Sequence, residues 1–254
     1  MSVKVRLSYS KLGKVRFTGH RDLAHIWERT LRKAEVPVAM SEGFTPRPRL
    51  AFGLALPTGA ESVIELLDIT LNTNFDLESD QLGNVLDDLG ERLSVALPEG
   101  IAVNDVWIPD NELISLQEGV VASSWLMMVD AADVAAEIDR VNTSDIVMLE
   151  RERKGERHLD DVRPSILELR LASATQLDQL KSQWDVDHSA TAVEVVLSTV
   201  GRGIRPTELV EVLVPGADPW DHLRRVLRTK QWIERDGQRL DVLADRAACP
   251  IGSA

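Results

Sequence analysis

A loop dense in turn-forming residues presents two arginines to the surface of the predicted fold. It reads SEGFTPRPR over residues 41–49, and its prolines stiffen the presentation of Arg47 and Arg49. Arginine suits bidentate recognition of phosphate or carboxylate, and a stiff loop lowers the ordering cost of binding. The loop therefore predicts an anion-binding site. The alternative is a structural turn whose arginines pair with Glu42 or Glu61.

Further cations fall on one side of the predicted strands. The strand at residues 3–9 alternates apolar and polar residues, and residues 14–17 continue in extended form. If the apolar sides face the helices, these cations gather on an open sheet face: Lys4, Arg6, Lys14, Arg16 and Arg49. The aromatic residues Tyr9, Phe17 and Phe52 fall on the core side, so phosphate pairing is expected rather than base stacking. The alternative is a solvated strand face with scattered cations.

His20 lies in the first turn of a predicted helix, beside Asp22. It could bind an anion together with the helix N-terminus, act in acid–base chemistry, or simply cap the helix. No serine or cysteine nucleophile is paired with it by a known motif. A capping or structural role is the favoured interpretation.

A second, weaker anion site is predicted at GRGIRPTEL, residues 201–209. Arg202 and Arg205 precede a helix with Pro206 near its start. The alternative is a flexible helix entry. Elsewhere, histidines near carboxylates match no metal-ligand spacing, so neither a metal nor a cofactor is expected.

The elements that position these residues follow the order β, α, β, β, α, β over residues 1–110. The same order is expected from residue 120 onward, with strands at 146–153 and 164–171 joined by a polar loop, and short helices at 205–214 and 220–228. We therefore predict an α+β protein with two ferredoxin-like (βαββαβ) halves and a short helical C-terminal extension. The predicted domains are residues 1–110, with the basic face, and residues 120–254, which are acidic.

The charge is divided unevenly along the chain. The 254 residues have a net charge of −12, but residues 1–50 contain 11 Lys and Arg against four acids, which gives +7 there and −19 in the remainder. Such asymmetry predicts an anionic ligand for the first part, whereas the overall acidity argues against non-specific nucleic-acid binding by the whole chain. There is neither an apolar run long enough to cross a membrane nor a signal peptide, so a cytoplasmic protein is expected.

The chain resembles the radical SAM-linked protein family, a bacterial domain of unknown function. The resemblance spans residues 10–62 and follows the pattern S-K-x-G-x-x-R-F-x-x-H-x-D-L, E-R-x-L-R-x-A and P-V-A-x-S-E-G-F-x-P-R-P. It implies a domain fused to, or encoded beside, a radical SAM protein, near genes of RNA metabolism. It supplies no catalytic residues. A radical SAM enzyme needs three cysteine ligands for its cluster, and this sequence has only Cys249, so the chain is not that enzyme.

Three functions remain open from the sequence. The first is an accessory module that binds RNA or another anion and serves a radical SAM partner. The second is a small-molecule enzyme in which His20 and Asp22 do acid–base work while Arg47 and Arg49 hold the substrate. The third is a protein-interaction scaffold, for which the arginines are expected to be tied up in intramolecular ion pairs.

Overall fold

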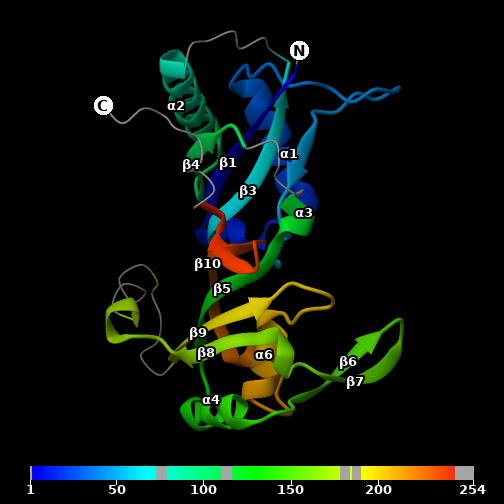
Figure 1. Cartoon of the computed structure of the whole chain (residues 1–254), viewed down its shortest axis with the longest axis vertical. Coiled ribbons are helices and arrows are strands. Elements are labelled where there is room, and N and C mark those ends of the chain that lie inside the picture. The colour runs from blue at the N-terminus through cyan, green and yellow to red at the C-terminus, as the bar shows by residue number, and fades with distance from the viewer. Residues whose placement is uncertain (1, 73–78, 110–115, 178–183, 185–189, 244–254) are drawn as a thin grey trace. The chain divides into compact units, whose positions relative to one another are not determined.

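The computed structural model describes residues 2–72, 79–109, 116–177, 184 and 190–243. The chain forms two compact units, residues 1–120 together with 232–254, and residues 121–231. The mixed α+β class is confirmed (Figure 1). Along the described residues, no helix is long and apolar enough to cross a membrane. Cys249 lies outside the described residues.

The first unit is a sheet with helices on one face. Its elements are β1 (Val3–Lys11), the short 3-10 helix η1 (Gly13–Phe17), α1 (His20–Lys33), β2 (Leu50–Phe52), β3 (Glu61–Leu71), α2 (Ser79–Ala96), β4 (Ile101–Trp107), α3 (Leu116–Gly119) and β11 (Gln238–Asp241). The strand order is β4-β1-β3-β2, and each neighbouring pair is antiparallel. The predicted element order for residues 1–110 is therefore observed, with η1 added.

The core of this unit lies between the sheet and the two long helices. Val5, Leu7 and Tyr9 point to it from β1, as the period-two alternation predicts. Leu23, Trp27 and Leu31 approach from α1, and the Tyr9 and Trp27 rings meet edge to face at 5.0 Å. This packing buries one side of α1 and leaves its opposite side to solvent.

The other face of the same sheet is also covered. Residues from three separate parts of the chain form a second, smaller core there: Ile64, Leu66, Trp107, Leu116 and Val242. Part of the face predicted to be open is therefore covered by residues 116 and 242, which are far from β1 in the sequence. Period-two alternation shows which residues share a face, but it does not show what covers that face.

The second unit contributes further strands to the nine-stranded sheet and contains a separate two-stranded hairpin. Its elements are β5 (Val120–Val129), which begins at the unit boundary, α4 (Val134–Thr143), β6 (Met148–Arg153), β7 (Glu156–Asp161), the 3-10 helix η2 (Arg163–Ser165), β8 (Ile166–Leu171), β9 (Thr191–Ser198), α6 (Pro206–Leu213), α7 (Pro219–His222) and β10 (Leu223–Arg235), whose end belongs to the first unit. The strand order is β10-β5-β9-β8, and β6 pairs only with β7.

Three local predictions are wrong. Residues 14–17 form η1 rather than an extended segment. Part of the predicted loop 154–161 is strand β7, because it pairs with β6. The predicted helix at 220–228 is helical only up to residue 222, and residues 223–228 belong to strand β10. The spacing of Trp220, Leu223 and Leu227 resembles a helical stripe, but pairing within the sheet overrides it. The helical extension is thus limited to α6 and α7, and strands follow it.

Candidate functional site

Arg6 does not lie on an open face. Its guanidinium is buried under the second core and forms a bidentate pair with Asp68, with Nε–Oδ1 at 2.7 Å and Nη2–Oδ2 at 3.0 Å. Because Asp68 neutralises it and the covered face hides it, Arg6 is a structural residue rather than part of an anion site.

Lys4 and Arg49 lie in one row across the sheet. Lys4 pairs with Thr70 in β3, and on the other side the backbone N of Thr70 donates to the Arg49 carbonyl at 3.1 Å. Both side chains are exposed. Residues opposite one another share a face, so the sheet places these two cations about 10 Å apart, two strand spacings.

η1 presents Lys14, Arg16 and Phe17 and is fixed by contacts to its backbone. The buried Lys11 Nζ donates to the carbonyls of Arg16 and Thr18 at 3.3 and 2.9 Å. Gly59 N also donates to the Arg16 carbonyl, at 2.8 Å. The Arg16 guanidinium lies 4.4 Å from the centroid of the Phe17 ring, and Phe17 is 63% exposed. Phe17 was expected in the core; the turn of η1 carries it outward.

Gly100 packs against the start of η1 so closely that a side chain at this position would collide with it. Its φ is +91°, and a Cβ there would lie 2.5 Å from the Leu12 carbonyl oxygen and 2.9 Å from a Val15 methyl. We expect Gly100→Ala to displace η1 and to lower the free energy of unfolding by about 1–3 kcal/mol. Urea unfolding measures this. Gly19→Ala is the control, because its Cβ meets nothing closer than 3.9 Å; equal effects of the two variants would contradict this role.

The loop at residues 41–49 projects from the first unit (Figure 1) and is closed by its own backbone. Ser41 N donates to the Arg47 carbonyl at 2.8 Å, and Arg47 N donates to Ser41 Oγ at 3.0 Å. Phe44 lies between Ser41 and Arg47 in the sequence and is completely exposed. The side chains of Arg47 and Arg49 are exposed as well. The exposure of the two arginines agrees with the sequence-based expectation, and the stiffness expected from the prolines stays a prediction.

A groove of about 460 Å³ separates this loop from α1. Most of its lining is apolar and comes from Leu31, Val36, Val38, Met40, Pro46 and Pro48. Three charged residues, Glu28, Arg32 and Arg47, also line it. The groove therefore brings a cation of α1 and a cation of the loop to the same apolar surface.

The outer side of α1 carries a stripe of cations that the sequence analysis did not single out. These residues are exposed: Arg21, His25, Arg29, Arg32 and Lys33. Positions 21, 25, 29 and 33 recur every four residues, so they share one helix face. This spacing is the signal that could have identified the stripe in the sequence.

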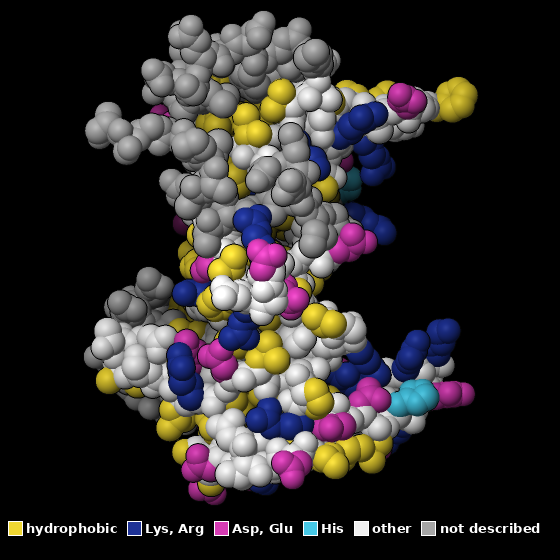
Figure 2. Space-filling view, in the orientation of Figure 1, with side chains coloured by type: hydrophobic (Ala, Val, Ile, Leu, Met, Phe, Trp, Pro, Cys, Tyr) yellow, Lys and Arg dark blue, Asp and Glu magenta, His cyan; other side chains and the backbone are white. Residues whose placement is uncertain are grey.

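Together these cations form what we call the basic ridge. It consists of Lys14, Arg16, Arg21, Arg29, Arg32, Lys33, Arg47 and Arg49. Within the described part of the chain, no carboxylate pairs with any of them. Figure 2 shows Lys and Arg side chains gathered along the edge of the first unit beneath the projecting loop. Three exposed arginines of the second unit, Arg140, Arg170 and Arg224, do form ion pairs with carboxylates.

His20 is not brought together with the loop arginines. Its exposed ring meets Phe52 edge to face at 5.1 Å and lines a small pocket with Tyr9 and Lys11. That pocket contains neither Arg47 nor Arg49, and the groove lined by Arg47 does not contain His20. The constellation required by the small-molecule enzyme is therefore not assembled in the described residues.

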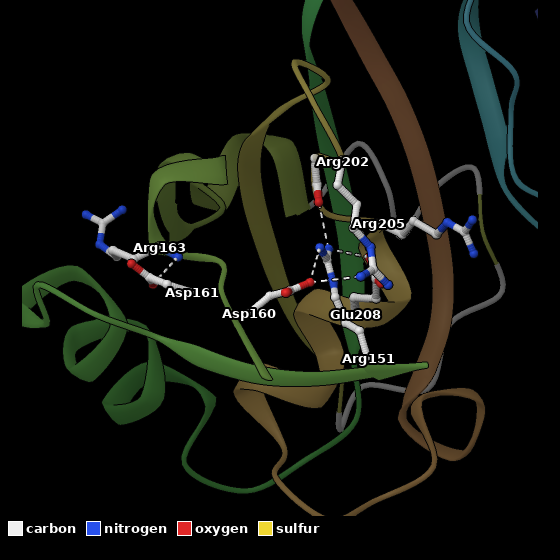
Figure 3. A network of polar contacts seen from close by, with 8 residues as sticks. Arg151, Asp160, Asp161, Arg163, Arg202, Arg205 and Glu208 are labelled. Atoms are coloured by element: carbon white, nitrogen blue, oxygen red, sulfur yellow. Dashed lines mark hydrogen bonds and ion pairs between the residues drawn. The ribbon is translucent and has the colours of Figure 1, made fainter. Parts of the chain in front are cut away.

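Arg202 and Arg205 belong to a polar network in the second unit (Figure 3). Arg202 pairs with Asp160 at 2.9 Å, and the backbone N of Arg205 donates to Glu208 at 2.8 Å. At the centre lies the buried Arg151, 2.9 Å from Glu208 and 3.5 Å from Asp160. Sequence reasoning missed Arg151, although alternation in β6 places it on the same side as the buried Leu149. The secondary anion site stays a prediction, and Asp160 already neutralises Arg202.

Residues of this network line a polar pocket that also contains Glu211. The carboxyl of Glu211 is expected to make the stability of the fold depend on pH. Burial, and then repulsion by Glu208, raises the pKa of its carboxyl. Between its ordinary pKa and the raised pKa, the folded protein keeps a proton on Glu211 that the unfolded chain has lost, so the free energy of unfolding falls as pH rises through this window. We expect Glu211→Gln to raise the free energy of unfolding at neutral pH by less than about 1 kcal/mol, because solvent screens a half-buried group.

Urea unfolding across the acidic range checks this expectation. The gain should vanish below about pH 4, where both states are protonated. Glu152→Gln, at an exposed position lining the same pocket, is the control and should show no such pH dependence. Identical pH profiles for the two variants would show that Glu211 is not the responsible group.

Comparison with known proteins identifies a family without assigning a function. Residues 4–206 match a family described as "Uncharacterized protein conserved in bacteria (DUF2344)". No curated protein is significantly similar to the chain. The match includes η1, α1 and the projecting loop, and hence the whole basic ridge.

Proposed function

The chain belongs to the DUF2344 family of uncharacterised bacterial proteins, and we propose that it is a non-catalytic accessory protein that binds RNA through the basic ridge. Another polyanion with regularly spaced phosphates would use the same contacts. The ridge, rather than the whole predicted sheet face, is the proposed binding surface, because part of the sheet face is covered and Arg6 is neutralised within it.

The observation that supports this proposal is the absence of carboxylate partners along the described ridge. A scaffold whose cations serve only the fold would pair them internally, as Arg6 is paired with Asp68. Cations left unpaired on the surface keep their charge available to phosphates, which dominate affinity for nucleic acids. The net charge of −12 does not cancel this attraction at contact, because exposed charges more than about 8–10 Å away are largely screened at physiological salt.

The partner that would receive the bound RNA is proposed from the family resemblance alone. That resemblance implies a radical SAM protein, encoded separately or fused, which would house the iron–sulfur cluster. A cytoplasmic location also stays a prediction. Co-purification of the full chain from bacterial cells, with bound protein and RNA both identified, tests the partnership; recovery without any radical SAM protein would argue against it.

Filter binding of RNA to the full chain tests the binding function. Arg47→Ala/Arg49→Ala is expected to bind about tenfold or more weakly at moderate salt, because two phosphate contacts are lost. The matched control is Arg170→Ala/Arg224→Ala, which removes the same charge from exposed but ion-paired arginines in the second unit. Equal affinity of wild type and the Arg47/Arg49 variant, or no RNA binding by wild type, would reject the proposal.

The fold that supports the ridge is proposed to be ferredoxin-like in both units. The two units have the same spatial order of strands: β4-β1-β3-β2 in the first unit corresponds to β10-β5-β9-β8 in the second. The β6–β7 hairpin is then an insertion in the second unit. Backbone NMR contacts between strands of the full chain test this assignment. Pairing of β1 with any strand other than β3 and β4 would exclude it for the first unit.

A further inference from the structure

Two phenylalanines of the first unit are exposed to solvent, although phenylalanine side chains are usually buried in the core. Phe44 at the tip of the loop is completely exposed, and Phe17 in η1 is 63% exposed. Single exposed apolar residues are common, but these two both neighbour unpaired cations of the basic ridge. Arg16 lies over the Phe17 ring, and Arg47 and Arg49 follow Phe44 in the same loop.

The two aromatic residues lie toward opposite ends of the basic ridge. η1 ends at Phe17 just before α1 begins, and the groove wall formed by Arg32 and the loop lies at the other end of α1. α1 has 14 residues, which corresponds to a length of about 21 Å. Cations on the outer face of α1 occupy the space between the two rings. The result is an elongated charged track with an aromatic ring near each end.

From this arrangement we infer that the ridge selects single-stranded RNA, with bases stacked on Phe17 and Phe44 and phosphates paired with the arginines. This inference rests on the proposed function and specifies its ligand. Proteins that bind single strands combine a positive track with aromatic stacking platforms, and both are present here. Base stacking was not expected from the sequence, because Tyr9, Phe17 and Phe52 were all predicted on the core side. Phe17 is exposed instead, so a stacking platform is present on this unit.

The apolar groove favours the same ligand. Met40 and the two loop prolines form an apolar wall, and Arg32 and Arg47 lie beside it. An unstacked base would bury its faces against this wall while its phosphate reached either arginine. A duplex keeps its bases stacked inside and offers only phosphates, so it would leave the aromatic rings and the groove unused.

Fluorescence anisotropy with the full chain and three labelled probes tests the inference. The probes are a single-stranded RNA of about 16 nucleotides, its duplex, and an abasic strand of the same length. Wild type is expected to bind the single strand about tenfold more tightly than either the duplex or the abasic strand. Phe17→Ala/Phe44→Ala should lose that preference and bind the single strand about tenfold more weakly, while the salt dependence stays unchanged.

The controls separate the failure of this inference from the failure of the proposed function. Val95→Ala removes another exposed apolar side chain of the first unit, 82% exposed on α2, and should bind like wild type. If the phenylalanine variant binds all three probes like wild type while Arg47→Ala/Arg49→Ala binds weakly, stacking is overturned and RNA binding stands. If wild type binds none of the probes, both proposals fail.

Discussion

Asp68→Ala is expected to lower the free energy of unfolding of the first unit by about 3–5 kcal/mol. The substitution leaves the Arg6 guanidinium buried without its counter-charge, since the side chains of Arg6 and Asp68 are only 5% and 6% exposed. Hydrogen exchange of β1 and β3 amides in urea measures this, because it reports on the first unit separately from the second.

Two further variants isolate the cause. Asp88→Ala removes an exposed partner of Arg92 and should cost less than about 1 kcal/mol. Arg6→Met/Asp68→Leu removes both buried charges and should restore most of the stability. The double variant should also bind RNA like wild type, because Arg6 is outside the ridge. Equal losses for Asp68→Ala and Asp88→Ala would contradict the buried pair.

Removing four ridge cations is expected to produce the largest effect on binding. For Arg29→Gln/Arg32→Gln/Arg47→Gln/Arg49→Gln we expect affinity for single-stranded RNA to fall by about 100-fold or more at low salt. The slope of log K against log salt should also decrease by about 3, because each lost phosphate contact on a single strand accounts for about 0.7. A salt titration of RNA binding measures both quantities.

A control of equal charge makes this result specific. Arg140→Gln/Arg157→Gln/Arg170→Gln/Arg224→Gln also removes four positive charges, but from ion-paired arginines of the second unit. It should change the affinity and the slope little. If both quadruple variants weaken binding equally, net charge rather than the ridge would explain the interaction.

Much of the first unit could be predicted from local patterns. Alternation in β1 correctly predicted that its apolar residues, among them Val5, Leu7 and Tyr9, face the helices and form the core. β10 was missed because its apolar spacing fits a helix as well, and only pairing within a sheet distinguishes the two. Local sequence does not contain that information.

The candidate site was predicted only in part. Arg47 and Arg49 were found because prolines close to them in the sequence are enough to predict a surface loop that presents them. Arg6 was misplaced because its environment depends on Leu116 and Val242, which come from distant parts of the chain. Phe17 was misplaced because η1 interrupts the alternation that assigned it to the core. The α1 stripe, in contrast, was detectable from its four-residue spacing.

Ultraviolet cross-linking of the full chain to single-stranded RNA, followed by mass spectrometry of the linked peptides, tests the central claim most directly. We expect cross-links at Phe17 and Phe44, with further links along α1, that disappear when unlabelled single strand competes. Cross-links confined to residues 121–231, or a pattern unchanged in Phe17→Ala/Phe44→Ala, would contradict it.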